Sequence, residues 1–426
     1  MGYYDPDVET HDRQALDGLQ RRKLGGMLQV VLANNAFYIR KLAGLEFDPL
    51  TDSLERLPFT TRDELQNDQR EHPPYGSNLT FPPDHYIRLH QTSATSGDMP
   101  LRWLDTAESW NWFKQCWRMI YRAAGVQSGD RLLFPFSFGP FVGFWAAFES
   151  ATDMGCLTIA AGGMTTTARL RMILDNAVTV IGCTPTYALR MAEVAESEGI
   201  DIATSPVRAL IVAGEPGGCV MATRARMESA WGARVFDHTG MTEIGSCSFE
   251  CVEAPGGVHV IESEFIAEVI DPETGGAVAD GSIGELVLTN LGRVGSPLIR
   301  YRTGDQVRMV RERCACGRWF ARLAGGILGR TDDMLLIRGN NVFPTAIEEV
   351  VRGFPIVEFR MTARQGSSLT ELKIEIEPAP GTDGRGITQK LCDAIRDRFN
   401  FKPMVVAVDP ETLPRYEMKS RRFIRE

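Results

Sequence analysis

The chain has 426 residues, of which 43% are hydrophobic and 24% are charged, and its formal net charge is −9 at pH 7. This length predicts two or three domains, and the composition is that of a soluble globular protein. The acidic balance, with no basic face to offset it, excludes nucleic acid as an expected partner.

Neither a signal peptide nor a membrane span is expected. The N-terminus is acidic and polar, and the most apolar stretch, residues 132–148, is broken by Pro135, Gly139 and Pro140. Nine cysteines form an odd number, and most of them stand singly in apolar surroundings. This pattern is typical of a reducing cytoplasm, where thiols stay free. We therefore expect a cytoplasmic protein with no membrane partner.

The predicted elements change in type along the chain. Amphipathic helix is expected around residues 15–43, then a Pro-rich connection, and a further helix is expected at 106–124. Between 129 and 214, apolar strands alternate with helices across short connections, which predicts a parallel sheet covered by helices. Beyond residue 250, alternation in twos with DPETGG and ADGSIG turns predicts antiparallel strands.

The last ~95 residues are expected to form a compact α+β unit, with helices at 344–353 and 386–399 between strands. The fold class is therefore α/β. It consists of a large N-terminal domain, residues 1–331, with helix-covered, mostly parallel sheets and a small antiparallel or barrel segment. A small C-terminal α+β domain, residues 332–426, follows it.

Residues 92–97, with the sequence TSATSG, contain no large side chain. Such a stretch buries little apolar surface, but it offers hydroxyls and closely approachable backbone N–H groups, which suit a phosphate. A flexible surface loop explains the same composition, so this stretch alone leaves both interpretations open.

Five further motifs follow in order: VAGEPGG (212–218), DHTGMTEIG (237–245), RYRTGD (300–305), GRTDDM (329–334) and PRYEMKSRR (414–422). Together with TSATSG they resemble, in order and spacing, the adenylate-forming acyl-CoA synthetase and ligase superfamily, and most closely its phenylacetate–CoA ligase family. The resemblance covers roughly residues 35–426. It implies that ATP activates a carboxylic acid to an acyl-adenylate, which a thiol then captures, and that the C-terminal domain is mobile.

The resemblance also implies the residues that bind ATP: Thr92, Ser93, Thr95, Ser96, Gly97, Gly214, Glu215, Pro216, Asp237, His238, Thr239, Thr242, Asp305 and Arg330. Within this set, residues 214–216 would line the adenine slot, residues 237–239 would flank the ring and the α-phosphate, and Asp305 would accept the ribose hydroxyls. Asp98 stands where that family often has a lysine, which removes one phosphate partner.

Lys419 and Glu243 are the predicted catalytic residues. The transition state of adenylation gains negative charge at phosphorus, and a mobile ammonium such as that of Lys419 can bridge it and the substrate carboxylate. The resemblance assigns Mg²⁺ to Glu243, and a carboxylate is the proper ligand for that hard ion. A frayed basic tail is the alternative interpretation of Lys419.

An aromatic acid is the expected substrate. The run FPFSFGPFVGFW (134–145) reaches the end of a predicted strand, where open α/β sheets bind their ligands. The resemblance implies a pocket for a flat ring here, and its predicted lining is Phe136, Phe138, Gly139, Phe141, Ala213 and Gly240.

Cysteine and histidine spacing predicts a separate zinc site. Cys251 and His259 are spaced C-x7-H, and Cys314 and Cys316 form C-x-C before a glycine. Three thiolates and one imidazole make a closed tetrahedral site of the structural type. Cys247 competes with Cys251 for one ligand position, and reduced, unligated thiols remain the alternative.

The predicted enzyme is a two-step ligase that uses ATP, Mg²⁺ and a thiol, with the C-terminal domain swinging about Asp332 or Asp333 between the steps. Coenzyme A is the expected thiol. An aryl-acid AMP ligase that loads the phosphopantetheine of a carrier protein is the alternative enzyme, and a non-catalytic nucleotide-binding regulatory protein is the alternative of another class. Homodimer formation stays open.

Overall fold

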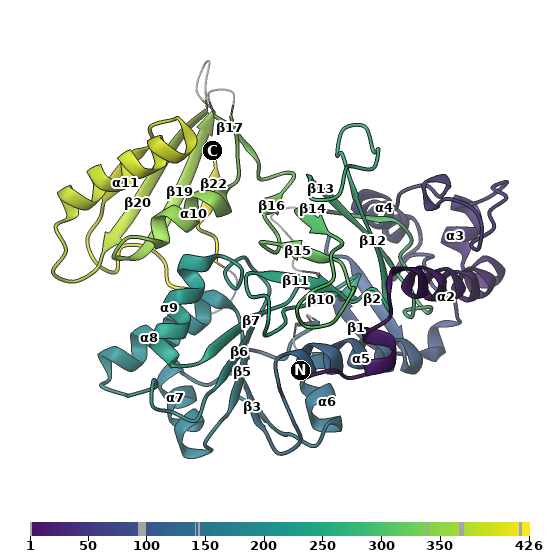
Figure 1. Ribbon diagram of the computed structural model, residues 1–426, viewed down its shortest axis with the longest axis horizontal. Helices are drawn as coiled ribbons and strands as arrows, with labels where there is room; N and C mark the ends of the chain where they lie inside the picture. Colours follow the sequence, from purple (N-terminus) through teal and green to yellow (C-terminus); the bar gives the residue numbers. More distant parts are fainter. Residues whose placement is uncertain are drawn as a thin grey trace.

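The computed structural model describes residues 2–92, 99–140, 142–143, 145–337, 340–365, 370–416 and 420–426. Figure 1 shows a large body and a smaller C-terminal unit, which lies beside helices α8 (Pro185–Ser197) and α9 (Met221–Trp231) of the body. In the described part of the chain, no helix combines the length and the apolar character that a membrane crossing requires.

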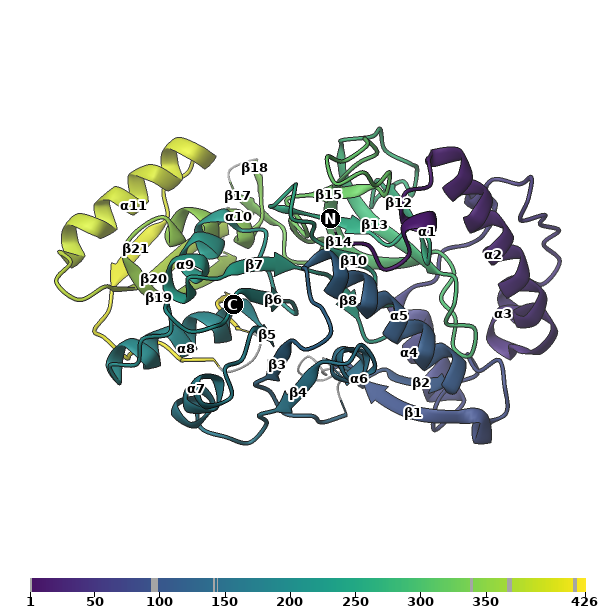
Figure 2. The same ribbon diagram turned by 60° about the horizontal axis from the view of Figure 1, so that its bottom comes forward.

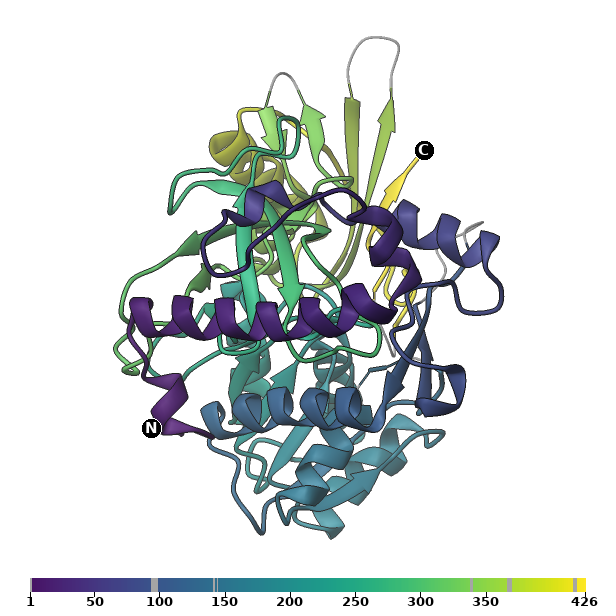
Figure 3. The same cartoon turned by 90° about the vertical axis from the view of Figure 1, so that its right-hand side faces the viewer.

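The N-terminal part of the body is helical, as the periodicity predicts. Its elements are α1 (Pro6–Glu9), α2 (Arg13–Asn34), α3 (Ala36–Lys41), a 3-10 turn at Leu54–Arg56, α4 (Arg62–Glu71) and a second 3-10 turn at Pro83–His85. Figure 3 shows α2 crossing the antiparallel strands, and Gln20 on α2 donates to the carbonyls of Glu262 and Phe265. Each of the long helices α2 and α4 begins at a side-chain cap, and α4 has a complete capping box of Thr61 and Glu64.

The centre of the body is a parallel sheet of five strands in the order β4-β3-β5-β6-β7, as expected from the alternation of strands and helices. Figure 2 shows helices on both of its faces. The strands are β3 (Arg131–Phe134), β4 (Leu157–Ala160), β5 (Val180–Cys183), β6 (Ala209–Val212) and β7 (Arg234–Asp237). The helices are α5 (Ala107–Ala123), α6 (Trp145–Asp153), α7 (Thr166–Asp175), α8 (Pro185–Ser197) and α9 (Met221–Trp231).

Alternate residues of these strands enter two different hydrophobic cores. Leu132 and Ile211 pack in the core that contains α5 and α6, whereas Leu133 and Leu210 pack in the core that contains α7, α8 and α9. Both faces of the inner strands β5 and β6 are therefore buried, which is why they read as continuous apolar runs in the sequence, whereas the edge strand β4 is partly exposed.

The antiparallel region also agrees with the alternation in twos. Its seven strands are β10 (Ser248–Phe249), β11 (Gly257–Val260), β12 (Phe265–Ile270), β13 (Ile283–Asn290), β14 (Tyr301–Val310), β15 (Arg322–Ala324) and β16 (Gly329–Arg330). Two short antiparallel pairs lie outside this sheet: β1 (Tyr86–Gln91) with β2 (Arg102–Thr106), and β8 (Gly240–Met241) with β9 (Gly245–Ser246). These two pairs were not predicted from the sequence.

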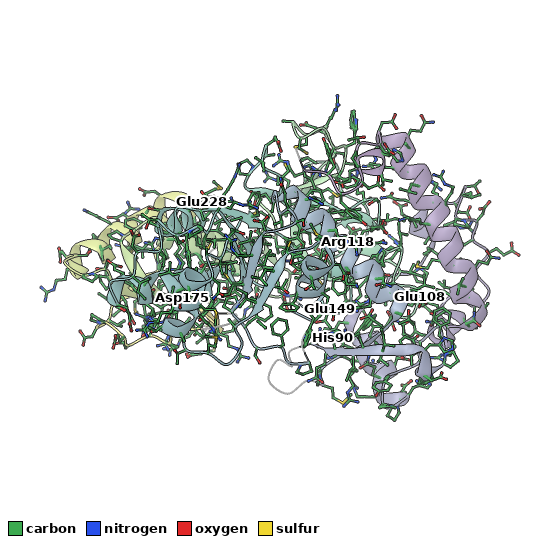
Figure 4. The ribbon with its side chains drawn as sticks, turned by 90° about the horizontal axis from the view of Figure 1, so that it is seen from below. His90, Glu108, Arg118, Glu149, Asp175 and Glu228 are labelled. Atoms are coloured by element: carbon green, nitrogen blue, oxygen red, sulfur yellow. The ribbon has the colours of Figure 1, made fainter. Side chains whose placement is uncertain are left out.

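The β1–β2 pair is joined to the parallel sheet's helices by aromatic contacts. His90 of β1 stacks on Trp110 of α5 with ring centroids 5.2 Å apart, and Trp110 Nε1 donates to Glu149 Oε2 of α6 at 2.7 Å. Figure 4 shows His90 and Glu149 close together on the underside of the molecule. The TSATSG stretch therefore follows a strand that is anchored to the main core.

The C-terminal unit has its own core, separate from the two cores of the body. Its elements are β17 (Leu335–Ile337), β18 (Asn340–Val342), α10 (Pro344–Arg352), β19 (Ile356–Gln365), β20 (Thr370–Pro378), α11 (Gly384–Phe399), β21 (Met404–Ala407) and β22 (Phe423–Arg425). The main sheet has the order β21-β20-β19-β22, so the last strand of the chain pairs with β19. An α+β unit is what the sequence predicts here, and the exact boundary at 331/332 stays a prediction.

Candidate functional site

Two of the predicted motifs lie at one edge of the parallel sheet. Residues 213–218 follow β6, and residues 238–243 follow β7, whose Asp237 pairs in register with Val212. Because the carboxyl ends of parallel strands meet at the same edge, segments 25 residues apart in the chain become neighbours. Gly214 has φ +94°, a conformation that favours glycine at this turn.

Asp237 is closely surrounded at this edge. A Cβ atom on Gly218 would lie 2.5 Å from Asp237 Cγ, so any larger residue at position 218 would collide with the Asp237 side chain. Burial raises the pKa of Asp237 to about 7, and the nearby Glu250 carboxylate adds to the rise. At neutral pH this carboxyl is therefore partly protonated.

His238 and Thr239 continue the same segment into the protein. The His238 ring meets the Trp117 ring edge-on with centroids 4.5 Å apart, and burial lowers its pKa to about 4, so the imidazole is neutral at pH 7. The Thr239 hydroxyl lies 2.7 Å from Ser248 Oγ. Both side chains are thus held by the body of the protein.

Glu243 lies in a polar cluster that joins three parts of the chain. Its Oε1 accepts a hydrogen bond from the Tyr301 hydroxyl at 2.8 Å and lies 3.7 Å from Arg62 Nη1. Arg62 Nη2 in turn donates to Thr92 Oγ1 at 3.3 Å. The structure thus brings Thr92, from the predicted phosphate-binding stretch, and Glu243 to the same guanidinium.

Arg62 and Tyr301 are site residues that were not predicted from the sequence. Tyr301 lies within the RYRTGD motif, next to the residues that were singled out, whereas Arg62 is an ordinary first residue of helix α4. The capping box around Thr61 fixes where α4 begins and so where this guanidinium stands. Asp98 removes the usual loop lysine, and Arg62 offers a cation at the same stretch.

Asp305 and Arg330 are brought together by strand pairing. They are register partners between β14 and β16, and Arg330 Nη1 lies 3.3 Å from Asp305 Oδ1. Arg330 Nε also bonds Asp332 Oδ1 at 2.9 Å, which links the predicted ribose site to the predicted hinge. Burial raises the pKa of Asp333, the second predicted hinge residue, and the neighbouring Asp332 carboxylate raises it further.

Half-buried aromatic side chains gather beyond the carboxyl end of β3. Phe136 and Phe138 have ring centroids 5.0 Å apart, and Phe138 meets Trp145 edge-on at 4.7 Å. Trp145 Nε1 donates to the Gly139 carbonyl at 3.0 Å, which holds the loop against α6. Ala213 lies at the same edge, two strands away.

Several predicted site residues lie outside the described residues. They are Ser93, Thr95, Ser96, Gly97, Phe141 and Lys419. The structure brings together the remaining predicted residues of the strand edge, and their roles stay predictions.

The predicted zinc ligands form a compact group apart from this edge. The ligand atoms of Cys251, His259, Cys314 and Cys316 all lie within 4.8 Å of one another, and Cys251 Sγ is 3.7 Å from Cys314 Sγ. A Zn–S bond of about 2.3 Å puts two thiolates of a tetrahedral site about 3.8 Å apart, so the group has the right size for zinc. Cys247 belongs elsewhere, because its Sγ lies 3.4 Å from Thr239 Oγ1.

The surroundings of this group also suit a metal. His259 Nδ1 lies 2.9 Å from the Phe320 carbonyl, which leaves Nε2 directed to Cys316 at 3.6 Å. The N-terminal segment covers the group: Tyr3 Oη donates to the Cys316 carbonyl, and the buried Arg318 pairs with the buried Glu9. This contact of the N-terminus was not predicted from the sequence.

Comparisons with known proteins give matches over most of the chain. The profile of the AMP-binding enzyme family matches residues 58–292, and that of the AMP-binding enzyme C-terminal domain matches residues 339–426. A phenylacetate-coenzyme A ligase of Thermus thermophilus is 33% identical over 382 residues, which is 88% of this chain and 84% of that protein. A phenylacetate-coenzyme A ligase of Pseudomonas putida is 35% identical over 361 residues, with 82% and 80% of the two chains covered.

A solved structure of a 2-hydroxyisobutyryl-CoA ligase is similar over the whole chain. In the postadenylation state, in complex with R3-HIB-AMP, it has a TM-score of 0.94 at 25% identity and covers 100% of this chain and 92% of its own. In the thioesterification state, with 2-HIB-AMP and CoA, the TM-score is 0.75 at 26% identity, with the same coverage. The arrangement of the body and the C-terminal unit therefore resembles the postadenylation state.

Proposed function

This chain belongs to the AMP-binding enzyme family as an adenylate-forming acid–coenzyme A ligase, and we propose that its acid substrate carries an aromatic ring. The observation that carries this proposal is the aromatic cluster of Phe136, Phe138 and Trp145 beyond β3. Half-exposed rings at a strand end provide flat apolar surface for a ring of the substrate. The names of two relatives, both phenylacetate-coenzyme A ligases, support the same substrate class.

A small branched hydroxy acid is the second candidate substrate. The relative with a TM-score of 0.94 is named for 2-hydroxyisobutyrate, an acid without a ring. An aromatic acid can pack its ring against the aromatic cluster, whereas a small hydroxy acid has no ring to do so. The rates with a panel of acids therefore distinguish the two candidates.

In the first half-reaction, a carboxylate oxygen of the acid attacks the α-phosphorus of ATP. The bond from that phosphorus to the bridging oxygen breaks, and pyrophosphate leaves with the bonding electrons. The Lys419 ammonium stabilises the charge that develops on phosphorus and holds the carboxylate in line. The hydroxyls of the 92–97 stretch and the Arg62 guanidinium bind the leaving phosphates, which is supported by the Arg62–Thr92 hydrogen bond.

Glu243 fits the role of the Mg²⁺ ligand. It is a buried carboxylate, and it is oriented by the Tyr301 hydroxyl. The ion would neutralise charge on the phosphates. Asp305, supported by Arg330, accepts the ribose hydroxyls, and the 214–216 and 237–239 segments enclose the adenine and the α-phosphate.

In the second half-reaction, the thiol sulfur of coenzyme A attacks the acyl carbon, and AMP leaves as the mixed anhydride breaks. The C-terminal unit swings about Asp332 or Asp333 between the two steps, which withdraws Lys419 and admits the thiol. The similarity to a relative's postadenylation state, which exceeds that to its thioesterification state, supports the assignment of the present arrangement to the stage before thiol capture.

The four-residue cysteine and histidine group holds a structural zinc ion in this proposal. Two observations support this. The group offers three sulfur donors and one nitrogen donor, and its sulfur–sulfur distance fits a tetrahedral zinc site. The ion would join β10–β11 to the 314–316 turn and to the N-terminal segment that packs on it.

The test is pyrophosphate exchange into ATP that depends on an added acid. The panel contains benzoic, hydroxybenzoic, aminobenzoic, phenylacetic and 2-hydroxyisobutyric acids. We expect an aromatic acid to give the highest kcat/KM, and fastest exchange with 2-hydroxyisobutyric acid would overturn the ring assignment. Exchange with none of the acids, together with nucleotide binding, would favour the non-catalytic alternative.

The thiol acceptor is tested with the best acid of this panel. Coenzyme A and a phosphopantetheinylated carrier protein are offered in parallel, and thioester yield is measured. Faster transfer to the carrier protein would favour the aryl-acid AMP ligase. A measurement of molar mass in solution tests homodimer formation in the same preparation.

A further inference from the structure

A carboxylate of the body reaches the C-terminal unit at the residue after the proposed catalytic lysine. Oε2 of Glu215 accepts hydrogen bonds from the backbone N–H and from the hydroxyl of Ser420, each at 2.7 Å. Oε1 of Glu215 accepts from the backbone N–H of Thr186, at the start of α8, at 2.8 Å. One oxygen is therefore anchored in the body, while the other holds the C-terminal segment.

A further hydrogen bond connects the C-terminal unit to the body beside this contact. Arg422 Nη1 donates to Thr186 Oγ1 at 2.9 Å, and both side chains are buried. The Arg422 guanidinium is oriented from within its own unit by a two-point pair with Glu358. Thr186 thus contacts Glu215 through its N–H and Arg422 through its hydroxyl, so residues 420 and 422 are fixed to the same point of the body.

The rest of the interface around α8 and α9 is loosely packed. A cavity of about 450 Å³ lies there, and its lining includes Leu189, Ala192, Arg226, Pro355 and Ile356. Arg226 spans it by donating to the carbonyl of Ile356 at 2.7 Å and to the carbonyl of Phe354. Directional polar contacts therefore decide how the C-terminal unit docks here, because a shared apolar core is absent from the described clusters.

We propose that Glu215 is a positioning residue that docks Ser420 and thereby sets where the Lys419 side chain starts during adenylate formation. This inference rests on the proposed role of Lys419. Ser420 follows Lys419 directly in the sequence. Holding the N–H and the hydroxyl of Ser420 therefore reduces the conformational freedom that has to be lost before the lysine can act.

The contacts that dock the C-terminal unit are also of a reversible kind. When the C-terminal unit leaves, the two Glu215–Ser420 hydrogen bonds and the Arg422–Thr186 hydrogen bond break together, and all the groups can be hydrated. The Glu215 carboxylate thus docks the C-terminal unit in the first half-reaction and keeps only its Thr186 contact in the second. An adenine-lining role for its side chain predicts the opposite, because the adenine is present in both half-reactions.

The experiment compares both half-reactions in the full-length enzyme, with the best acid of the panel. Glu215→Gln keeps the size of the side chain but offers an NH2 group either to Thr186 or to Ser420, both of which need an acceptor. We expect it to lower kcat for pyrophosphate exchange by roughly 10- to 100-fold, as for a misplaced catalytic group. We expect KM for ATP and thioester formation from supplied acyl-adenylate to stay within about 3-fold.

Ser420→Ala and Arg226→Gln complete the design. Ser420→Ala removes one of the two donors, and we expect roughly a 5-fold lower kcat for exchange, with no further loss when it is combined with Glu215→Gln. Arg226→Gln weakens the same interface away from Ser420, and we expect less than about a 3-fold change in exchange. Because Ser420→Ala alters only a hydroxyl, it keeps the test decisive if Glu215→Gln folds poorly.

Three results would overturn the proposal: Glu215→Gln and Ser420→Ala exchanging like wild type, an effect confined to KM for ATP, or an equal loss in Arg226→Gln. Failure of the proposed function looks different. In that case wild-type enzyme shows no acid-dependent exchange, or Lys419→Ala exchanges at the wild-type rate.

Discussion

Glu243 in the body and Ser420 in the C-terminal unit both belong to the candidate site, but they are held in different ways. Glu243 is 4% exposed, is hydrogen-bonded by Tyr301 and belongs to a segment that continues directly from the parallel sheet. Ser420 is half-buried and meets the body through the carboxylate of Glu215. The first is fixed by the same core that forms the fold, and the second by contacts that water can replace.

This difference fits the two tasks that a two-step ligase has to combine. Binding the phosphates and the metal calls for groups that are oriented in advance, and in the proposed mechanism the body supplies them from strand ends and a helix cap. Admitting a second substrate to the same acyl group calls for a part that can leave. Figure 1 shows the C-terminal unit beside the body, and this unit has a core of its own, so the proposed swing would leave the cores of the body closed.

The largest expected effect tests whether the movable region serves only the first step. Lys419→Ala should lower acid-dependent pyrophosphate exchange by at least about 1,000-fold, because the charge on phosphorus loses its ammonium partner. Thioester formation from supplied acyl-adenylate should stay within about 3-fold of wild type. Lys402→Ala, an exposed lysine of the same unit, is the control. An equal loss in both half-reactions would contradict the division of labour.

The next effect tests what stabilises the body. Cys316→Ala should remove the bound zinc and lower the free energy of unfolding by about 3 kcal/mol, since a closed metal site contributes to folding. Metal content and a urea titration check this. Cys247→Ala is the control and should keep its zinc, because Cys247 lies beside Thr239. Full zinc in Cys316→Ala would show that the group does not bind metal.

Glu243→Gln tests the part of the candidate site that belongs to the body. We expect roughly a 100-fold lower kcat for exchange and a higher Mg²⁺ concentration for half-maximal rate, because an amide is a weaker ligand for a hard ion. Tyr301→Phe removes only the hydroxyl that orients the carboxylate, so we expect a smaller loss of about 5-fold. An unchanged Mg²⁺ requirement in Glu243→Gln would remove Glu243 from the metal site.

The smallest expected effect concerns the pH dependence of stability. Two buried neighbours in the body, His238 and Asp237, change the free energy of unfolding in opposite directions as the pH falls. The pKa of His238 is lowered to about 4, so the unfolded chain binds more protons than the folded one between pH 4 and 6.5, and this group destabilises the fold as the pH falls. The pKa of Asp237 is raised to about 7, so the folded chain binds more protons between about pH 4 and 7, and this group stabilises the fold as the pH falls.

Asp237→Asn should therefore leave the destabilising effect of His238 at lower pH unopposed. Relative to wild type, the variant should lose about 1.5 kcal/mol of unfolding free energy between pH 6.5 and 5. Urea titrations at the two pH values measure this difference. Parallel pH profiles of the two proteins would show that Asp237 is ionised across this range.

Much of the candidate site could be predicted from local sequence. The order of strands and helices, the turn glycines and the C-x7-H and C-x-C spacing are local patterns, and each led to elements or groups that the structure contains. Arg62 could not be found in this way. An arginine at the start of a helix is common, and only the path of α4 past β1 and β14 brings it to Thr92 and Glu243.

The sequence by itself therefore determined the α/β class, the helix-covered parallel sheet, the separate C-terminal unit and many, but not all, of the residues of the candidate site. Only the tertiary structure decided that Cys251 rather than Cys247 joins the cysteine group, that Glu9 meets Arg318 and that Glu215 reaches Ser420. Backbone patterns follow from neighbours in the chain, whereas these contacts join residues that are far apart in it. A carboxylate or thiol has no preferred partner until the packing of the sheets and helices brings one within hydrogen-bond distance.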